Sequence, residues 1–234
     1  MKILLSFVFS FISMALFAQY VMDPNAQQRP LSGSFSGIKV SGGIDLYLNQ
    51  SGTEAIAVSA AEAKYADEIK TVIENNMLRI YIDNSKWSVR NKKLKAYVSF
   101  KQLETLEASG ACYVKVSGEI KVASLKMDLS GASDFTGAVN LQNLKLDLSG
   151  ASDVKISGKA GTVTIESSGA SDVKGRGLVT DICHATAFGA SDIEITVNKE
   201  INARASGASK IYYSGTAALG KVQTSGAGLV EKKG

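Results

Sequence analysis

Apolar and polar residues alternate one by one in many short segments of this chain. In Asp153–Ser157 and again in Thr162–Ser167, every second residue is Val or Ile, and the residues between them are polar. Alternation with a period of two places apolar side chains on one face of a β-strand and polar side chains on the other. These segments therefore predict strands with one buried face.

Such strand pairs recur at a nearly fixed interval, marked by a Gly that follows Ser or Phe. Successive marks lie 18 to 21 residues apart, and four copies read SGASD or FGASD in full. The marks are Ser109-Gly110, Ser130-Gly131, Ser149-Gly150, Ser168-Gly169, Phe188-Gly189, Ser206-Gly207 and Ser225-Gly226. A period near twenty residues predicts one structural unit stacked on itself, because a single unit of this size cannot bury its apolar face alone.

Aligning the copies gathers apolar residues into three columns that we expect to line the interior. The first column holds Val114, Phe135, Val154, Val173, Ile193, Ile211 and Val230. The second holds Leu125, Leu144, Val163, Cys183 and Ile201, and the third holds Met127, Leu146, Ile165, Ala185 and Ala203. We predict an all-β fold in which residues 108–234 form a right-handed β-helix-like solenoid, with coils of about 19 residues that each advance about 4.8 Å.

The turn motif places a Gly and an Ala side by side in every copy. The Gly supplies a position that adopts positive φ at a sharp corner. The Ala column consists of Ala111, Ala132, Ala151, Ala170, Ala190, Ala208 and Ala227. A small residue in every copy indicates a crowded inner corner, so we expect Ala151→Leu to destabilise the fold by about 1–3 kcal/mol through overpacking.

Residues 31–107 form a different, β-rich region without the repeat. Apolar patterning predicts strands at Phe35–Val40, Ile44–Asn49, Ala55–Ser59, Met77–Ile82 and Leu94–Phe100, and a short helix at Ala60–Ile69. Ser41–Asp45 (SGGID) is a degenerate echo of the repeated motif. The repeat geometry is therefore expected to begin before Ser109.

The first residues have the pattern of a targeting segment. Lys2 precedes the apolar run Ile3–Phe17, and Ala18 before Gln19 suits a cleavage site. We interpret residues 1–18 as a signal peptide, with an uncleaved anchor as the alternative, and residues 19–30 as a disordered leader. No Cys follows the run to carry a lipid. The chain is expected to be exported, to the periplasm, the outer-membrane surface or the medium.

Charge and cysteine content narrow the classes of partner and bond. Loss of Lys2 with the signal peptide leaves a formal charge of +3, which is too balanced to favour nucleic acid. The two cysteines, Cys112 and Cys183, fall in different columns about three coils apart, or roughly 14 Å at the usual strand spacing. A disulfide requires Cα atoms within about 7 Å, so both are expected to remain free thiols.

Several motifs together resemble the exported head GIN domain proteins of Bacteroidetes, a family of autotransporter-type adhesins. The matching features are Phe35–Ile38 (FSGI), Gly43–Leu46 (GIDL), Leu103–Gly110 (LETLEASG), the SGASD copies and Ser206–Gly215 (SGASKIYYSG). The resemblance implies a β-helix-like fold at the cell envelope and an adhesive role, and it brings no catalytic residues. Phe188, in place of Ser, and the degraded last copy Ser225–Gly228 depart from the pattern.

An acidic column is the one candidate for a metal. Asp134, Asp153, Asp172 and Asp192 follow the turns of successive coils. Carboxylates at about 4.8 Å spacing can share Ca²⁺ between coils. The competing interpretation is that each Asp bonds the backbone of its own turn. We favour turn chemistry, because Lys155 and Lys174 lie beside the column, and we expect no metal or other cofactor.

His184 is the sole histidine of the chain. Alternation places it outward, while its neighbour Cys183 points inward. A catalytic base requires a nucleophile and an orienting group, and a zinc site requires further ligands. Neither set is indicated, so we interpret His184 as a solvated surface residue.

The densest run of charge offers a binding patch. Its members are Lys86, Trp87, Arg90, Lys92, Lys93 and Lys95. Cations beside one large aromatic suit an acidic glycan or an anionic lipid surface. The alternative is a solvated hairpin loop whose Trp folds back on the protein. Tyr212 and Tyr213 are a second candidate, since exposed aromatics stack on sugars.

These features favour an exported, non-enzymatic adhesion or interaction module that binds a glycan or another envelope surface component. The alternative is a β-helical enzyme that cleaves polyuronates. Such an enzyme requires clustered carboxylates or a Ca²⁺ site with basic residues. The repeat region contains only two arginines, Arg176 and Arg204, and its acidic residues are interleaved with lysines.

Overall fold

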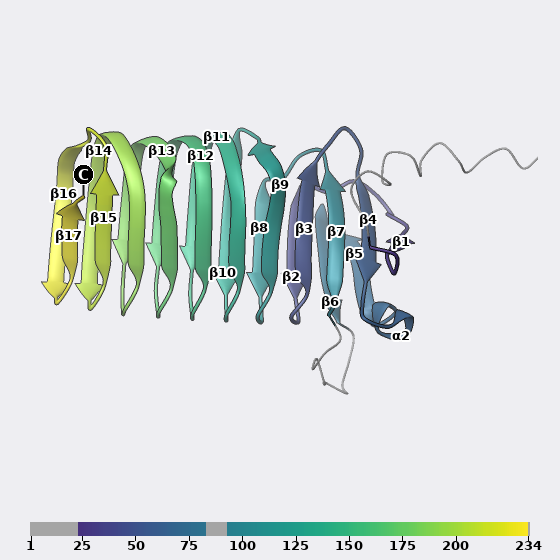
Figure 1. The fold of residues 1–234 in the computed structure, drawn as a ribbon. Coiled ribbons are helices and arrows are strands. Elements are labelled where there is room, and N and C mark those ends of the chain that lie inside the picture. Colours follow the sequence, from purple (N-terminus) through teal and green to yellow (C-terminus); the bar gives the residue numbers. More distant parts are fainter. Residues whose placement is uncertain (1–22, 83–92, 234) are drawn as a thin grey trace, which may run out of the picture.

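A computed structural model describes residues 23–82 and 93–233. The strands lie side by side in a long stack of coils (Figure 1). The N-terminal elements are β1 (Gln27–Arg29), β2 (Gly37–Ser41), β3 (Asp45–Gln50), β4 (Ala55–Ser59), α2 (Ala63–Ala66), β5 (Ile69–Glu74), β6 (Met77–Ile82), β7 (Lys95–Phe100) and β8 (Thr105–Ser109). The rest are β9 (Tyr113–Lys121), β10 (Ser124–Ser130), β11 (Asp134–Leu148), β12 (Asp153–Ser167), β13 (Asp172–Ala187), β14 (Asp192–Gly207), β15 (Lys210–Ser214), β16 (Ala218–Gly226) and β17 (Leu229–Lys232).

The repeat region is a parallel solenoid, as the period predicted. Asp134 pairs with Asp153, which pairs with Asp172, and each later position follows in register. The turns that carry the repeated motif line one edge of the stack, the lower edge in Figure 1, and we call this the turn edge. Strand residues that follow a turn form the outgoing face, and those that lead into the next turn form the returning face. β11 to β14 bend midway and supply both faces.

The interior columns form one continuous core. Residues of the three predicted columns are buried in every coil before the last, and the core cluster runs from Phe35 to Ala217. The N-terminal strands belong to the same stack, since Ser41 pairs with Ser109 and Leu46 with Val114 in parallel register. The SGGID segment is thus an earlier coil of the solenoid, as its likeness to the repeat predicted.

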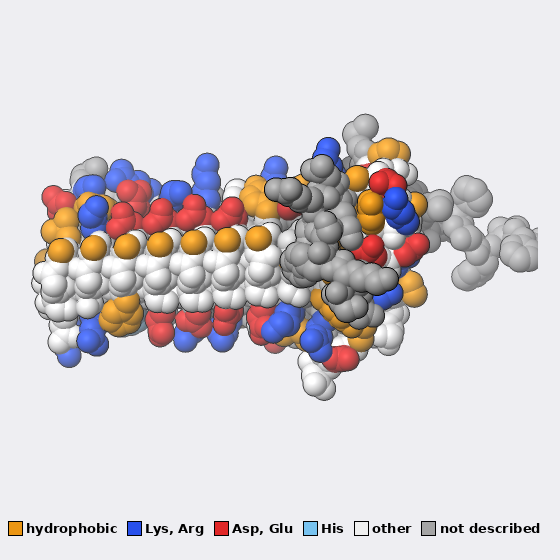
Figure 2. Space-filling view, turned by 90° about the horizontal axis from the view of Figure 1, so that it is seen from below, with side chains coloured by type: hydrophobic (Ala, Val, Ile, Leu, Met, Phe, Trp, Pro, Cys, Tyr) orange, Lys and Arg blue, Asp and Glu red, His pale blue; other side chains and the backbone are white. Residues whose placement is uncertain are grey.

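The crowded residue of the turn is the Gly, and the predicted inner position of the Ala is wrong. All seven alanines are exposed, and a regular row of apolar side chains runs along the turn edge in Figure 2. Gly150 has a φ of +82°, and a Cβ there would overlap the carbonyl oxygen of Gly131 in the preceding coil. The backbones of successive glycines touch, while the alanine methyl groups point to solvent.

The residue after the Ala closes each turn with a hydrogen bond. Ser133, Ser152, Ser171 and Ser209 are fully buried, and each hydroxyl donates to the carbonyl of the residue three positions earlier, at 2.9–3.1 Å. The thiol of Cys112 takes the same place and lies 3.2 Å from the carbonyl oxygen of Ser109. This is the turn column in which the alignment placed Cys112.

The N-terminal region departs from prediction in three elements. β1 pairs antiparallel with β4, so residues 27–29 of the predicted disordered leader are a strand. The predicted helix is only α2, four residues long. β5 was not predicted, and it forms an antiparallel hairpin with β6 through Asn75 and Asn76 at φ of 51° and 61°. Asn-Asn is the sequence signal for this turn, because Asn tolerates the left-handed conformation.

Candidate binding surface

The structure reaches only part of the predicted basic patch. Lys86, Trp87, Arg90 and Lys92 lie outside the described residues, whereas Lys93 is exposed. Lys95 points toward Asp23, with 3.4 Å between the ammonium nitrogen and a carboxylate oxygen. One of the two described members is therefore engaged in an ion pair within the chain.

Asp23 is the centre of a polar cluster that ties the leader to the solenoid. Its carboxylate accepts hydrogen bonds from the Tyr97 hydroxyl at 2.8 Å, the Ser59 hydroxyl at 2.9 Å and the Asn25 backbone N–H at 3.1 Å. Burial alone would raise the pKa of Asp23, but these bonds and the charge of Lys95 outweigh it and lower the pKa below its ordinary value. The cluster is structural, because its polar groups bind one another.

The predicted tyrosine pair does not form an exposed aromatic surface. Tyr213 is 5% exposed and belongs to the core, so its assignment as a binding residue is wrong. Tyr212 is partly exposed, but the ammonium nitrogen of Lys233 lies 3.2 Å from its ring centroid. A sugar stacking on Tyr212 would have to compete with this cation.

The acidic column is present on the outgoing face. The four aspartates are neighbours in consecutive coils, and Lys174 lies 3.3 Å from Asp153. Across residues 23–82 and 93–233, no group of three or more His, Cys, Asp or Glu is placed to hold a metal ion. In that part of the chain, the side-chain bonds that close the turns come from the serines described above.

The histidine and the cysteines lie where the alignment placed them. His184 is exposed on the returning face, between Thr164 and Asn202 of the neighbouring coils. Cys112 and Cys183 are free and buried. Burial raises the pKa of the Cys183 thiol to about 12, which keeps it protonated and unreactive at neutral pH.

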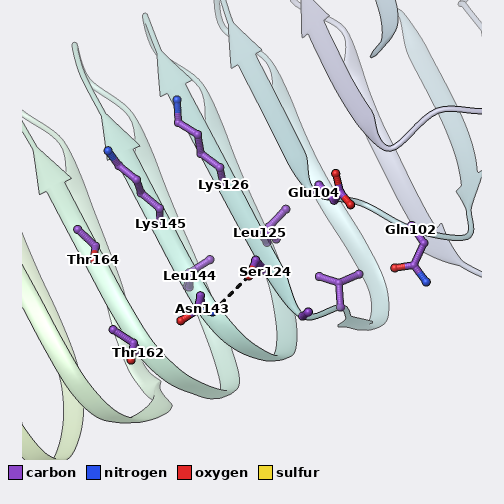
Figure 3. A pocket seen from close by; sticks show the side chains of 12 residues that line it. Gln102, Glu104, Ser124, Leu125, Lys126, Asn143, Leu144, Lys145, Thr162 and Thr164 are labelled. Atoms are coloured by element: carbon purple, nitrogen blue, oxygen red, sulfur yellow. Dashed lines mark hydrogen bonds between the residues drawn. The ribbon is translucent and has the colours of Figure 1, made fainter. Parts of the chain in front are cut away.

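A shallow groove with a volume of about 510 Å³ lies on the returning face (Figure 3). We call it the returning groove. It is lined by Gln102, Glu104, Val122, Ala123, Ser124, Leu125, Lys126, Asn143, Leu144, Lys145, Thr162 and Thr164. Parallel pairing puts these side chains in rows along the solenoid, so that the groove crosses β10, β11 and β12. Its long direction therefore follows the stack of coils.

Hydrogen-bonding groups recur along the returning groove at the coil spacing of about 4.8 Å. Ser124, Asn143 and Thr162 form one row, and the Asn143 amide donates to the Ser124 hydroxyl at 3.3 Å. Lys126 and Lys145 form a second row with Thr164. The arrangement offers regularly spaced donors and acceptors to a linear, hydroxyl-rich ligand.

The lysines of the returning groove are held in place by acidic neighbours. The ammonium groups of Lys126 and Lys145 lie 3.6 and 3.4 Å from carboxylate oxygens of Asp147. Lys145 also lies 3.9 Å from Glu166. Sequence reasoning missed this groove because its row members differ in residue type from coil to coil. The available signal was the repeat register, which already placed them in shared columns.

A second shallow groove, of about 430 Å³, lies on the outgoing face. Gly137, Ala138 and Gly177 are among its lining residues, and the cations Lys155, Lys174 and Arg176 contribute to its lining. Arg176 donates to Glu194 at 2.9 Å, and Lys174 pairs with Asp153. Its cations are thus largely neutralised, and it offers fewer uncharged hydrogen-bonding groups than the returning groove.

Comparisons with known proteins identify relatives of the sequence and of the fold. Residues 34–217 match the family described as "Putative auto-transporter adhesin, head GIN domain". Comparison with curated protein sequences gives no match. Where the chain is described, it contains no helix of the length and apolar character needed to cross a membrane.

Solved structures share the architecture at low sequence identity. A putative adhesin from Bacteroides fragilis superposes with a TM-score of 0.83 and 21% identity, covering 89% of this chain and 96% of the other. A putative lipid binding protein from Parabacteroides distasonis gives 0.67 and 19% identity over 91% and 98% of the two chains. A putative adhesin from Parabacteroides merdae gives 0.61 and 18% over 91% and 98%. At these identities the likeness establishes the fold.

Proposed function

Because the chain belongs to the head GIN domain family of adhesin-type proteins, we propose that it is a non-catalytic recognition module of the cell envelope that binds a glycan in the returning groove. The observation that supports this most is the row of Ser124, Asn143 and Thr162, beside the row of Lys126, Lys145 and Thr164. Both rows run in the direction that an extended polymer would follow.

The chemistry of the groove suits sugars. Hydroxyl and amide groups exchange hydrogen bonds with sugar hydroxyls, and ammonium groups add stronger, charge-assisted bonds. Val122 and Ala123 give the groove an apolar part that can contact the C–H face of a sugar ring. Few precisely placed polar groups over apolar surface are characteristic of ligand sites.

The lining supports binding rather than cleavage. Glycoside hydrolysis normally uses two carboxyl groups on either side of the scissile bond. Glu104 is the one carboxylate among the lining residues of the returning groove. A bound glycan would meet a single acidic group at one end of the groove, with no second carboxylate in the lining to complete the pair.

A glycan array, followed by titration of the best ligand, tests this function. We expect the double variant Asn143→Ala/Thr162→Ala to weaken binding at least about tenfold, since losing two hydrogen bonds at about 1 kcal/mol each exceeds one decade. The matched control Asn140→Ala/Thr186→Ala makes the same chemical changes outside the groove and should bind like the parent.

Two further measurements distinguish the alternatives. Chromatography of the glycan after prolonged incubation should show unchanged chain length, and shortening would contradict a non-catalytic role. Lipid vesicles should not compete with the glycan. Vesicle binding with no glycan binding would replace the proposed ligand by a membrane lipid.

A further inference from the structure

The two ends of the solenoid are finished differently. At the N-terminal end, β4 pairs antiparallel with β7 and β1 pairs antiparallel with β4, and every residue of β4 is buried. At the other end, within the described residues, β16 pairs only with β14 and β17 only with β15. Every residue of β16 is exposed. Figure 1 shows these two strands at the free end of the stack.

Side chains of the interior columns become exposed in this last coil. Ile201 is 0% exposed, whereas Leu219, its partner in register, is 57% exposed. Ala203 is 4% exposed and its partner Val222 is 39% exposed. The difference arises because each earlier coil is covered by the next one, and the described chain supplies no further coil.

We propose that the end face, formed by β16 and β17 with Leu219 and Val222, is the surface through which two copies of this chain dimerise end to end. Each edge strand has one row of backbone N–H and C=O groups directed away from the stack, and such edges pair readily with another strand. The end face is a coil-to-coil contact, of the kind found throughout the solenoid, that lacks its second half.

A second copy is the occupant that fits, because its own end face has the same cross-section and the same two edges. Head-to-tail stacking into a filament is blocked, since the antiparallel strands β4 and β1 close the N-terminal end. A two-fold axis across the stack makes the new strand pairs antiparallel, a favourable geometry for β-strands. The dimer is then closed, with both outer ends capped.

Charge on the last coil predicts how this dimer responds to salt. Lys221 and Lys232 are exposed there with Glu231, so that two end faces meet with like net charge. Salt screens this repulsion and leaves apolar and backbone contacts intact. The association should therefore strengthen as ionic strength rises.

Sedimentation equilibrium of the purified chain tests the proposal. We expect a concentration-dependent mass rising toward twice that of one chain, and scattering of a rod about twice as long as the monomer. Val222→Glu should raise the dimer dissociation constant at least about tenfold. The matched control Val72→Glu changes a Val of similar exposure, 37%, on β5, and it should leave the constant unchanged.

Circular dichroism of both variants confirms that they fold, and the parent's mass and length require no variant at all. A parent that stays monomeric at every concentration and salt would overturn the proposal. A dimer that is no longer than the monomer, or one that Val222→Glu does not weaken, would show that the copies meet elsewhere.

Discussion

The turn edge and the two strand faces of this solenoid use sequence in opposite ways. Along the turn edge the same residues recur, and the fold accounts for the Gly and the second Ser of each copy. On the faces, residues in one column change from coil to coil, as in Ser124, Asn143 and Thr162. The difference teaches that the repeated motif reports architecture, while the candidate binding chemistry lies where the repeat is broken.

The largest expected effect separates the two small residues of one turn. Gly150→Leu should destabilise the protein by about 3–5 kcal/mol, because it forces positive φ on a branched residue and places its Cβ against the Gly131 carbonyl. Ala151→Leu, on the exposed neighbour, should change stability by less than about 0.5 kcal/mol. Urea unfolding measures both. Equal losses would show that the Ala is also packed.

A smaller effect comes from the polar cluster near the N-terminal end of the outgoing face. Asp23→Asn should cost about 1–2 kcal/mol at pH 7 by weakening charge-assisted hydrogen bonds. Because the folded state lowers the pKa of Asp23, its contribution is present above the ordinary value of 3.8 and is lost as pH falls through the lowered one. Parent and variant should therefore converge in stability below about pH 3, and a constant difference would contradict the linkage.

The smallest of the stability effects concerns the buried serines. Ser152→Ala should cost about 1 kcal/mol, since the hydroxyl donates to the Ser149 carbonyl at 3.1 Å. Ser191 occupies the same column, but its hydroxyl has no hydrogen-bond partner in the described part of the chain. Ser191→Ala should then cost less than Ser152→Ala in thermal melts. The reverse order would mean that the turn bond is not what the column provides.

Sequence alone predicted the parallel stack, its register and its interior columns, because alternation and period directly encode burial in a solenoid. It could not decide which of two adjacent small residues is crowded, since Gly150 and Ala151 recur with equal regularity. Only the approach of Gly131 resolves that choice. β1 was missed because Gln27–Arg29 has no apolar alternation and becomes a strand through pairing with β4.

The candidate site was less predictable than the fold. Lys95 looked like a free cation, but folding brings Asp23 to it across a long stretch of sequence. Tyr213 looked exposed, but its side chain turns into the core. The returning groove depends on side chains from several coils meeting along one face, so its shape exists only after the coils stack.

The contrast between edge and face is tested most directly by binding measurements on two variants with the same glycan. Ala151→Glu places a charge on the turn edge, and Asn143→Ala/Thr162→Ala removes hydrogen bonds from the returning groove. We predict that the edge variant binds like the parent, and that the groove variant loses at least about tenfold in affinity with little change in melting temperature. Binding lost in the edge variant but kept in the groove variant would contradict the assignment of recognition to the strand faces.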